Sequence, residues 1–102
     1  MEREMVEAVQ RYLEGPINNL QPGEWVRWKK MCKNMNAPDY DEPIMVIKVF
    51  DSPLVDVEKP GSGYYGEKYD FRAFIGADED GDVAFYAFNS WRFERCDAPE
   101  LT

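Results

Sequence analysis

The chain contains no histidine, so it lacks the side chain that most often serves as general base, metal ligand and pH switch. A serine–histidine or cysteine–histidine nucleophile pair is therefore impossible. Carboxylate pairs remain conceivable among Asp39, Asp41, Glu42, Asp56, Glu58 and Asp70. A pair that cleaves glycosidic bonds needs a deep cleft with two carboxylates at a set separation, which one small domain rarely provides. We therefore expect a protein without enzyme activity.

Metal and nucleotide motifs are equally weak. Cys32 and Cys96 show no CxxC spacing, and a structural zinc site needs four Cys or His ligands. If Gly81 stood at the sixth position of a calcium-binding EF-hand loop, non-acidic residues would occupy the two obligatory acidic positions. The GxGxxG letters at 61–66 follow no expected strand and precede no expected helix. We expect no bound metal and no cofactor.

Length and composition predict one folded domain over residues 1–102, with 44% hydrophobic and 15% aromatic side chains to form a core. Apolar runs are far shorter than the roughly 18 residues that span a membrane. The first residues also lack the apolar segment of a secretory signal. We therefore expect a cytoplasmic protein with no membrane association and with reduced thiols.

The charge is strongly acidic and unevenly distributed. The net charge is −8, and the excess of carboxylates lies in residues 36–102. Such a domain repels a phosphate backbone at long range and is drawn toward basic protein surfaces. The alternative interpretation is that the negative charge only keeps a small protein soluble.

An amphipathic helix is predicted over residues 2–14, ended by Gly15-Pro16. Its apolar residues recur at helical spacing and form one stripe: Met5, Val6, Val9, Tyr12 and Leu13. A stripe of this kind must be covered. We expect it to pack on its own domain, and the alternative is a homodimer in which it pairs with a second copy.

Short strands separated by turns follow the helix. Alternation and β-branched or aromatic residues predict strands at 24–30, 44–50, 68–75, 83–88 and 91–95. Long loops are expected at 33–43 and 51–67, a tight hairpin at Asp80-Gly81, and a short 3₁₀ element or turn at Asn89-Ser90. The core is assigned to Val46, Val49, Phe71, Ile75, Val83 and Phe85. This order predicts a small bent antiparallel barrel over 22–96 and a flexible tail at 97–102.

The segments 23–28 (Gly-Glu-Trp-Val-Arg-Trp), 43–49, Asp80-Gly81 and 92–94 resemble the layout of small SH3-like barrels. The resemblance implies a mainly β fold, an N-terminal helix followed by a five-stranded antiparallel SH3-like barrel. Many uncharacterised bacterial and phage-encoded small proteins look similar. Because these motifs encode barrel geometry, they imply a fold and no particular activity.

The leading functional hypothesis is a non-enzymatic, acidic protein-binding module that docks on a protein with a basic surface. The expected binding residues are Asp39, Asp41, Glu42, Asp56, Glu58, Asp78, Glu79, Asp80 and Asp82, with Tyr64 and Tyr65 as aromatic anchors. In its more specific form, this module is an inhibitor from a mobile element such as a phage. It would block a nucleic-acid-binding surface of a host protein by presenting carboxylates in place of phosphates.

The alternative hypothesis is a nucleic-acid or ribonucleoprotein-binding domain that uses Trp25, Arg27, Lys29 and Lys30. Stacking on tryptophan and neutralisation of phosphates by cations hold single strands. Strand alternation places Trp25, Arg27 and Lys29 on one face and turns Val26 and Trp28 toward the core.

Overall fold

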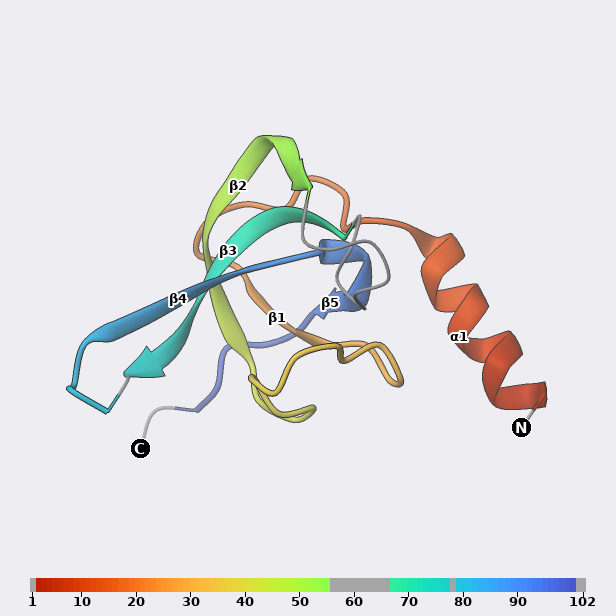
Figure 1. Cartoon of the computed structure of the whole chain (residues 1–102), viewed down its shortest axis with the longest axis horizontal. Coiled ribbons are helices and arrows are strands. Elements are labelled where there is room, and N and C mark those ends of the chain that lie inside the picture. Colours follow the sequence, from red (N-terminus) through yellow and green to blue (C-terminus); the bar gives the residue numbers. More distant parts are fainter. Residues whose placement is uncertain (1, 56–66, 78, 101–102) are drawn as a thin grey trace.

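In the part of the chain that the structure describes, one α-helix, five strands and a short 3₁₀ helix follow each other (Figure 1). The computed structural model describes residues 2–55, 67–77 and 79–100. The elements are α1 (Glu2–Glu14), β1 (Trp25–Trp28), β2 (Ile44–Val55), β3 (Lys68–Ala77), β4 (Val83–Phe88), the 3₁₀ helix η1 (Ser90–Arg92) and β5 (Phe93–Arg95). The predicted fold class, mainly β with an N-terminal helix and five antiparallel strands, is confirmed.

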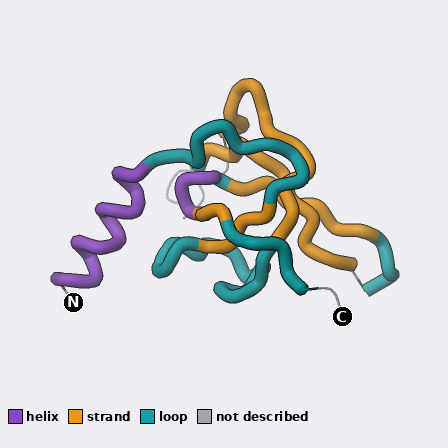
Figure 2. The backbone as a smooth tube through the Cα atoms, turned by 180° about the vertical axis from the view of Figure 1, so that it is seen from behind, coloured by secondary structure: helices purple, strands orange, loops and turns teal. Residues whose placement is uncertain are grey.

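The strands form one antiparallel sheet in the order β4-β3-β2-β1-β5. The short strand β1 joins β2 to the last strand of the chain, because it pairs with β2 on one side and with β5 on the other. β4 and β5 therefore lie at the two edges of the order. Figure 2 shows the strands in orange and the helices in purple from the opposite side. Closure of this sheet into a barrel stays a prediction.

β2 is longer and more bent than the sequence indicated. It continues to Val55, so the loop predicted to begin at residue 51 was wrong for residues 51–55. The register of β2 against β3 shifts between Val49 and Leu54, where Figure 1 shows β2 folding over at its top. Pro53 falls inside this register shift, a place in a strand where its missing N–H is tolerated.

The core is built on aromatic rings from four segments. Trp28 stacks on Phe93 at 4.2 Å between ring centroids, and the edge of Phe71 meets Phe93 at 5.3 Å. The indole Nε1–H of Trp28 donates a hydrogen bond to the Pro38 carbonyl oxygen at 2.7 Å, so its polar atom is satisfied inside the protein. The buried cluster comprises Leu20, Val26, Trp28, Ile44, Val46, Phe71, Ala73, Phe88 and Phe93. Val46 and Phe71 are confirmed as core, and Val49 and Ile75 pack partly buried against it.

Two predicted core residues on β4 are exposed instead. Val83 is 55% exposed and Phe85 is 44% exposed, so their assignment to the core was wrong. The buried residue of β4 is Phe88. Since successive side chains in a strand alternate between faces, residues 83 and 85 lie on the opposite face from Phe88.

The helix α1 has the predicted bounds, but most of its apolar stripe is not covered. Met5, Val6 and Val9 are 55–61% exposed and Leu13 is 73% exposed, so the expected packing of these residues on their own domain was wrong. The contacts of α1 with the domain come from Tyr12 at the end of the stripe and from polar groups near the helix C-terminus. Tyr12 meets the Trp91 ring edge to face at 5.0 Å, and the Lys29 Nζ donates to the Arg11 carbonyl oxygen and pairs with Glu14.

None of the helices in the described ranges is long and apolar enough to cross a membrane.

The core assignment predicts a contrast between two phenylalanines. Phe93→Ala should lower the free energy of unfolding by about 3–5 kcal/mol, because it opens a cavity among buried rings. Phe85→Ala should lower it by less than about 1 kcal/mol, because Phe85 is 44% exposed and lies outside the buried cluster. Urea denaturation followed by tryptophan fluorescence measures both values. Equal losses of unfolding free energy for the two variants would contradict the difference in burial between Phe93 and Phe85.

Candidate partner-binding surface

The β3–β4 hairpin presents carboxylates at its tip. The turn contains Gly81 at φ +84°, a conformation that favours glycine, and the predicted hairpin is confirmed. Glu79, Asp80 and Asp82 are exposed there. Asp80 and Asp82 also take part in interactions within the protein.

A row of large apolar side chains crosses the sheet behind this tip. The register aligns Trp25 with Met45, Met45 with Phe74, and Phe74 with Phe85, on four neighbouring strands. All four lie on the face opposite the buried Val26, Val46 and Ala73. The centroids of the Phe74 and Phe85 rings are 6.1 Å apart, and the two residues are 36% and 44% exposed.

Carboxylates and exposed rings together form one candidate surface at this end of the sheet, which we call the hairpin surface. Its members are Phe74, Glu79, Asp80, Asp82, Val83 and Phe85. Interface centres are enriched in aromatic residues and surrounded by a polar rim. Sequence reasoning missed the apolar half because it placed Phe85 and Val83 in the core. The opposite alternation of Phe85 and Phe88 along one strand was the signal that could have found it.

The other described acidic candidates lie elsewhere. Asp39, Asp41 and Glu42 belong to the connection between β1 and β2, which Figure 1 shows apart from the β3–β4 tip. Asp39 pairs with Lys33 at 3.7 Å, and its N–H donates to the Glu42 carboxylate at 3.1 Å. The structure therefore divides the predicted acidic surface into two groups. Five predicted residues lie outside the described ranges: Asp56, Glu58, Tyr64, Tyr65 and Asp78.

The basic residues of the alternative hypothesis are largely engaged within the protein. Trp25 and Arg27 face outward while Val26 and Trp28 are buried, as alternation predicts. Arg27 Nε donates to Glu94 at 2.8 Å, and this contact raises the pKa of Arg27. Lys29, expected on the open face, is only 6% exposed, and its Nζ lies 3.5 Å from the Glu14 carboxylate. Lys30 remains exposed.

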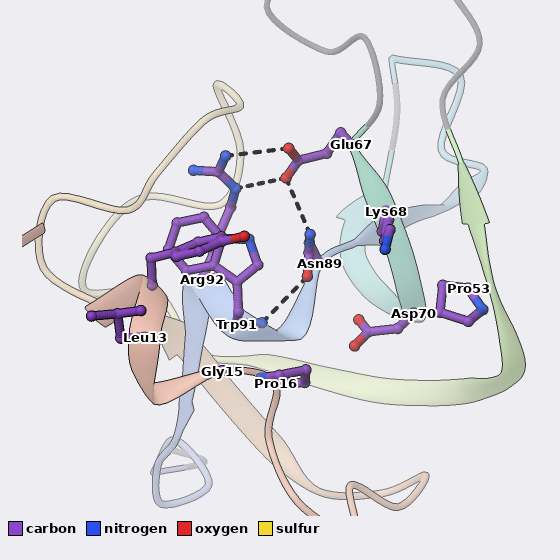
Figure 3. Close-up of a pocket in the computed structure, with 11 residues that line it drawn as sticks. Leu13, Gly15, Pro16, Pro53, Glu67, Lys68, Asp70, Asn89, Trp91 and Arg92 are labelled. Atoms are coloured by element: carbon purple, nitrogen blue, oxygen red, sulfur yellow. Dashed lines mark hydrogen bonds and ion pairs between the residues drawn. The ribbon is translucent and has the colours of Figure 1, made fainter. Parts of the chain in front are cut away.

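A groove of about 570 Å³ lies where the end of α1 meets η1 (Figure 3). The Arg92 side chain forms part of one wall of this groove. Its Nε and Nη2 donate to the two Glu67 carboxylate oxygens at 2.7 and 3.3 Å, and its Nη1 donates to the Cys32 carbonyl oxygen at 3.0 Å. The guanidinium also lies 4.4 Å from the centroid of the Trp91 ring. Both partners of the ion pair are mostly buried.

Asp70, a candidate for a catalytic carboxylate pair, has a structural role in the same groove. Its two oxygens accept hydrogen bonds from the backbone N–H and the hydroxyl of Ser90, at 2.7 and 2.6 Å. The Ser90 hydroxyl in turn accepts the Ile17 N–H at 3.1 Å. This chain of bonds ties the segment after α1 to η1 and β3. Glu67, Asp70 and Arg92 in the groove therefore connect segments of the fold.

Metal-binding groups do not gather in the described ranges, where no three Asp, Glu or Cys side chains lie close enough to hold one ion. Cys32 and Cys96 are free thiols. Burial raises the pKa of both, so at neutral pH they are protonated and weakly nucleophilic.

Comparisons with known protein families, curated proteins and solved structures found no match to this chain.

A second ion pair joins β5 to the residue before β1. Arg95 Nε donates to Glu24 at 2.6 Å, and the Gln21 N–H donates to the same carboxylate at 2.7 Å. The hydrogen bond from Arg95, followed by that from Gln21, holds the pKa of Glu24 below its ordinary value of 4.5. The charged carboxylate therefore stabilises the folded state above that value, and the contribution is lost as the pH falls through the lowered pKa.

This coupling predicts a pH-dependent effect of Glu24→Gln. At neutral pH the variant should be less stable than wild type, because Arg95 loses its charged partner. The difference should shrink once the pH falls well below 4.5, where Glu24 is protonated in both states. Thermal melts across this pH range measure the difference, with Glu100→Gln in the exposed tail as the control. A deficit that stays constant with pH would contradict the role given to the charge.

Proposed function

We propose that this protein is a non-enzymatic protein-binding module whose hairpin surface docks on a basic protein surface. The observation that carries the proposal is the exposed Phe74–Phe85 pair directly behind an acidic turn. Aromatic side chains in the centre of an interface supply most of its binding energy once water is excluded. Carboxylates at its rim attract the partner and set its orientation.

The distribution of ion pairs supports a basic partner. In the described ranges, six basic residues are already within 4.0 Å of carboxylates: Arg3, Arg27, Lys29, Lys33, Arg92 and Arg95. The protein has a net charge of −8, so the field that a partner meets is dominated by carboxylates. Opposite charges then accelerate encounter, and this acceleration weakens as salt screens the field.

The same distribution disfavours the nucleic-acid alternative. Lys29 is buried beside Glu14, and Arg27 is held by Glu94. Phosphates would have to compete with these carboxylates for their cations, inside a field that already repels a polyanion.

In its more specific form, the proposal is an SH3-like barrel from a mobile element that inhibits a nucleic-acid-binding host protein. The resemblance of residues 22–96 and the single five-stranded antiparallel sheet after an N-terminal helix support the SH3-like part. The acidic tip supports the inhibitory part, because carboxylates and phosphates compete for the same lysines and arginines.

Charge reversal tests the acidic half of the hairpin surface. The partner is first isolated from nuclease-treated lysate of the native host and purified, and its affinity is then measured by titration. Glu79→Lys/Asp80→Lys/Asp82→Lys should weaken binding at least about tenfold, or about 1.4 kcal/mol. A control variant with the same net charge, Glu2→Lys/Glu4→Lys/Asp97→Lys, should bind like wild type. Equal weakening in both variants would assign the effect to net charge and overturn a localised surface.

Truncation of an aromatic ring tests the apolar half. Phe74→Ala should weaken binding at least about tenfold while the melting temperature changes little, because the exposed ring contributes more to the interface than to the core. Leu54→Ala is the matched control, since Leu54 is a similarly exposed apolar residue on β2. Unchanged affinity of Phe74→Ala would remove Phe74 from the interface. Binding of a fluorescent single-stranded oligonucleotide, weakening steeply with salt, would instead support the alternative hypothesis.

A further inference from the structure

Apart from Tyr12, whose ring meets Trp91, the apolar stripe of α1 is turned away from its own domain, with Met5, Val6, Val9 and Leu13 all exposed. The half-buried residues of the helix are Glu7, Ala8 and Arg11, which lie on its polar side. Figures 1 and 2 place α1 at one end of the molecule, joined to the domain at its C-terminal end. A strongly amphipathic helix docked through its polar side leaves a contiguous apolar patch in solvent, which marks an interaction site.

The spacing of this stripe is symmetric about Val9. Met5 and Leu13 stand four residues before and after it, and Val6 and Tyr12 stand three residues before and after it. In an antiparallel pair of such helices, Val9 meets Val9 of the second copy, and Met5 meets Leu13. A patch that complements itself under a two-fold rotation is what an isologous interface requires.

We propose that two copies of this chain form a dimer by antiparallel packing of their α1 helices about a two-fold axis at Val9. This inference is independent of the hairpin surface. We assign a second copy of the chain as the partner of the stripe, because the spacing of the stripe residues is complementary to itself under a two-fold rotation.

Charge complementarity supports the same register. At about 100° of rotation per residue, Arg3 and Glu14 fall on the same flank of the helix. In an antiparallel pair, equal flanks of the two helices face each other, so Arg3 of one copy lies near Glu14 of the other. The Arg3 side chain is 93% exposed with Glu7 at 3.8 Å, and the Glu14 side chain is 61% exposed although it also pairs with the buried Lys29, so both have an open side for such a contact. Antiparallel packing also places the positive end of each helix dipole beside the negative end of the other.

The size of the patch predicts a modest affinity. One helix face buries less surface than a standard stable interface, which covers about 1,600 Å² in total. We therefore expect a reversible dimer with a dissociation constant in the micromolar range, visible only as the concentration rises.

Sedimentation equilibrium of the full chain over a wide concentration range tests the dimer. Wild type should shift from monomer toward dimer, whereas Val9→Glu should weaken dimerisation at least about tenfold, because it places two carboxylates together at the axis. Gln10→Glu adds the same charge on the neighbouring position off the stripe and should dimerise like wild type. Circular dichroism of both variants checks that the helix is retained. A wild type that stays monomeric up to millimolar concentration would overturn the proposal.

Cysteine cross-linking tests the antiparallel register. Under mild oxidation Val9→Cys should form a covalent dimer, since the two cysteines meet at the axis. Met5→Cys alone should give no more dimer than wild type, but a mixture of Met5→Cys and Leu13→Cys chains should cross-link. Cross-linking of Met5→Cys with itself would indicate parallel helices and overturn the register. Neither measurement involves the basic partner, so the dimer proposal and the hairpin-surface proposal can each be refuted without the other.

Discussion

The guanidinium of Arg92 joins several separate segments of this structure. It binds Glu67 with two nitrogens, it caps the Cys32 carbonyl with the third, and its flat face covers Trp91. These contacts join the start of β3, the connection between β1 and β2, and η1. Because Trp91 is held in place, its ring offers an edge-to-face contact to Tyr12. The orientation of α1 therefore depends on a residue that lies far from it in the sequence.

That orientation explains why apolar side chains remain in solvent on a small protein with a well-packed aromatic core. Lys29 is drawn inward by Glu14 and by the carbonyl of Arg11, and so it holds the polar side of α1 toward the domain. On the sheet, the core occupies one face, and the residues of the opposite face on β4 and at the end of β3 meet water. The helix and the sheet thus each pack one side against the rest of the protein and leave apolar residues of the other side in solvent.

The sequence predicted the order and type of the elements well, because periodicity and turn residues are local signals. The helix at 2–14, the strand at 83–88 and the turn at Asp80-Gly81 follow from such signals. Which face of an element is buried depends on contacts between distant residues, and periodicity does not reveal it. Phe85 was therefore assigned to the core, and the stripe of α1 was expected on its own domain. For the same reason Lys29 was expected in solvent, since its partner Glu14 lies one element earlier. The acidic residues were identified by composition, but their division into two groups follows from the sheet topology.

The placement of α1 and the β3–β4 tip has a consequence for binding strength. They lie at opposite ends of the long axis of the molecule, which measures 41 Å (Figure 1). Two chains joined through α1 would carry their acidic tips outward, at the two far ends of the assembly. Such a particle is bivalent, and a partner with two suitably spaced basic sites would meet the second tip at a high effective concentration after binding the first. Modest affinity at each tip would then be compatible with tight and long-lived occupation of a repetitive target.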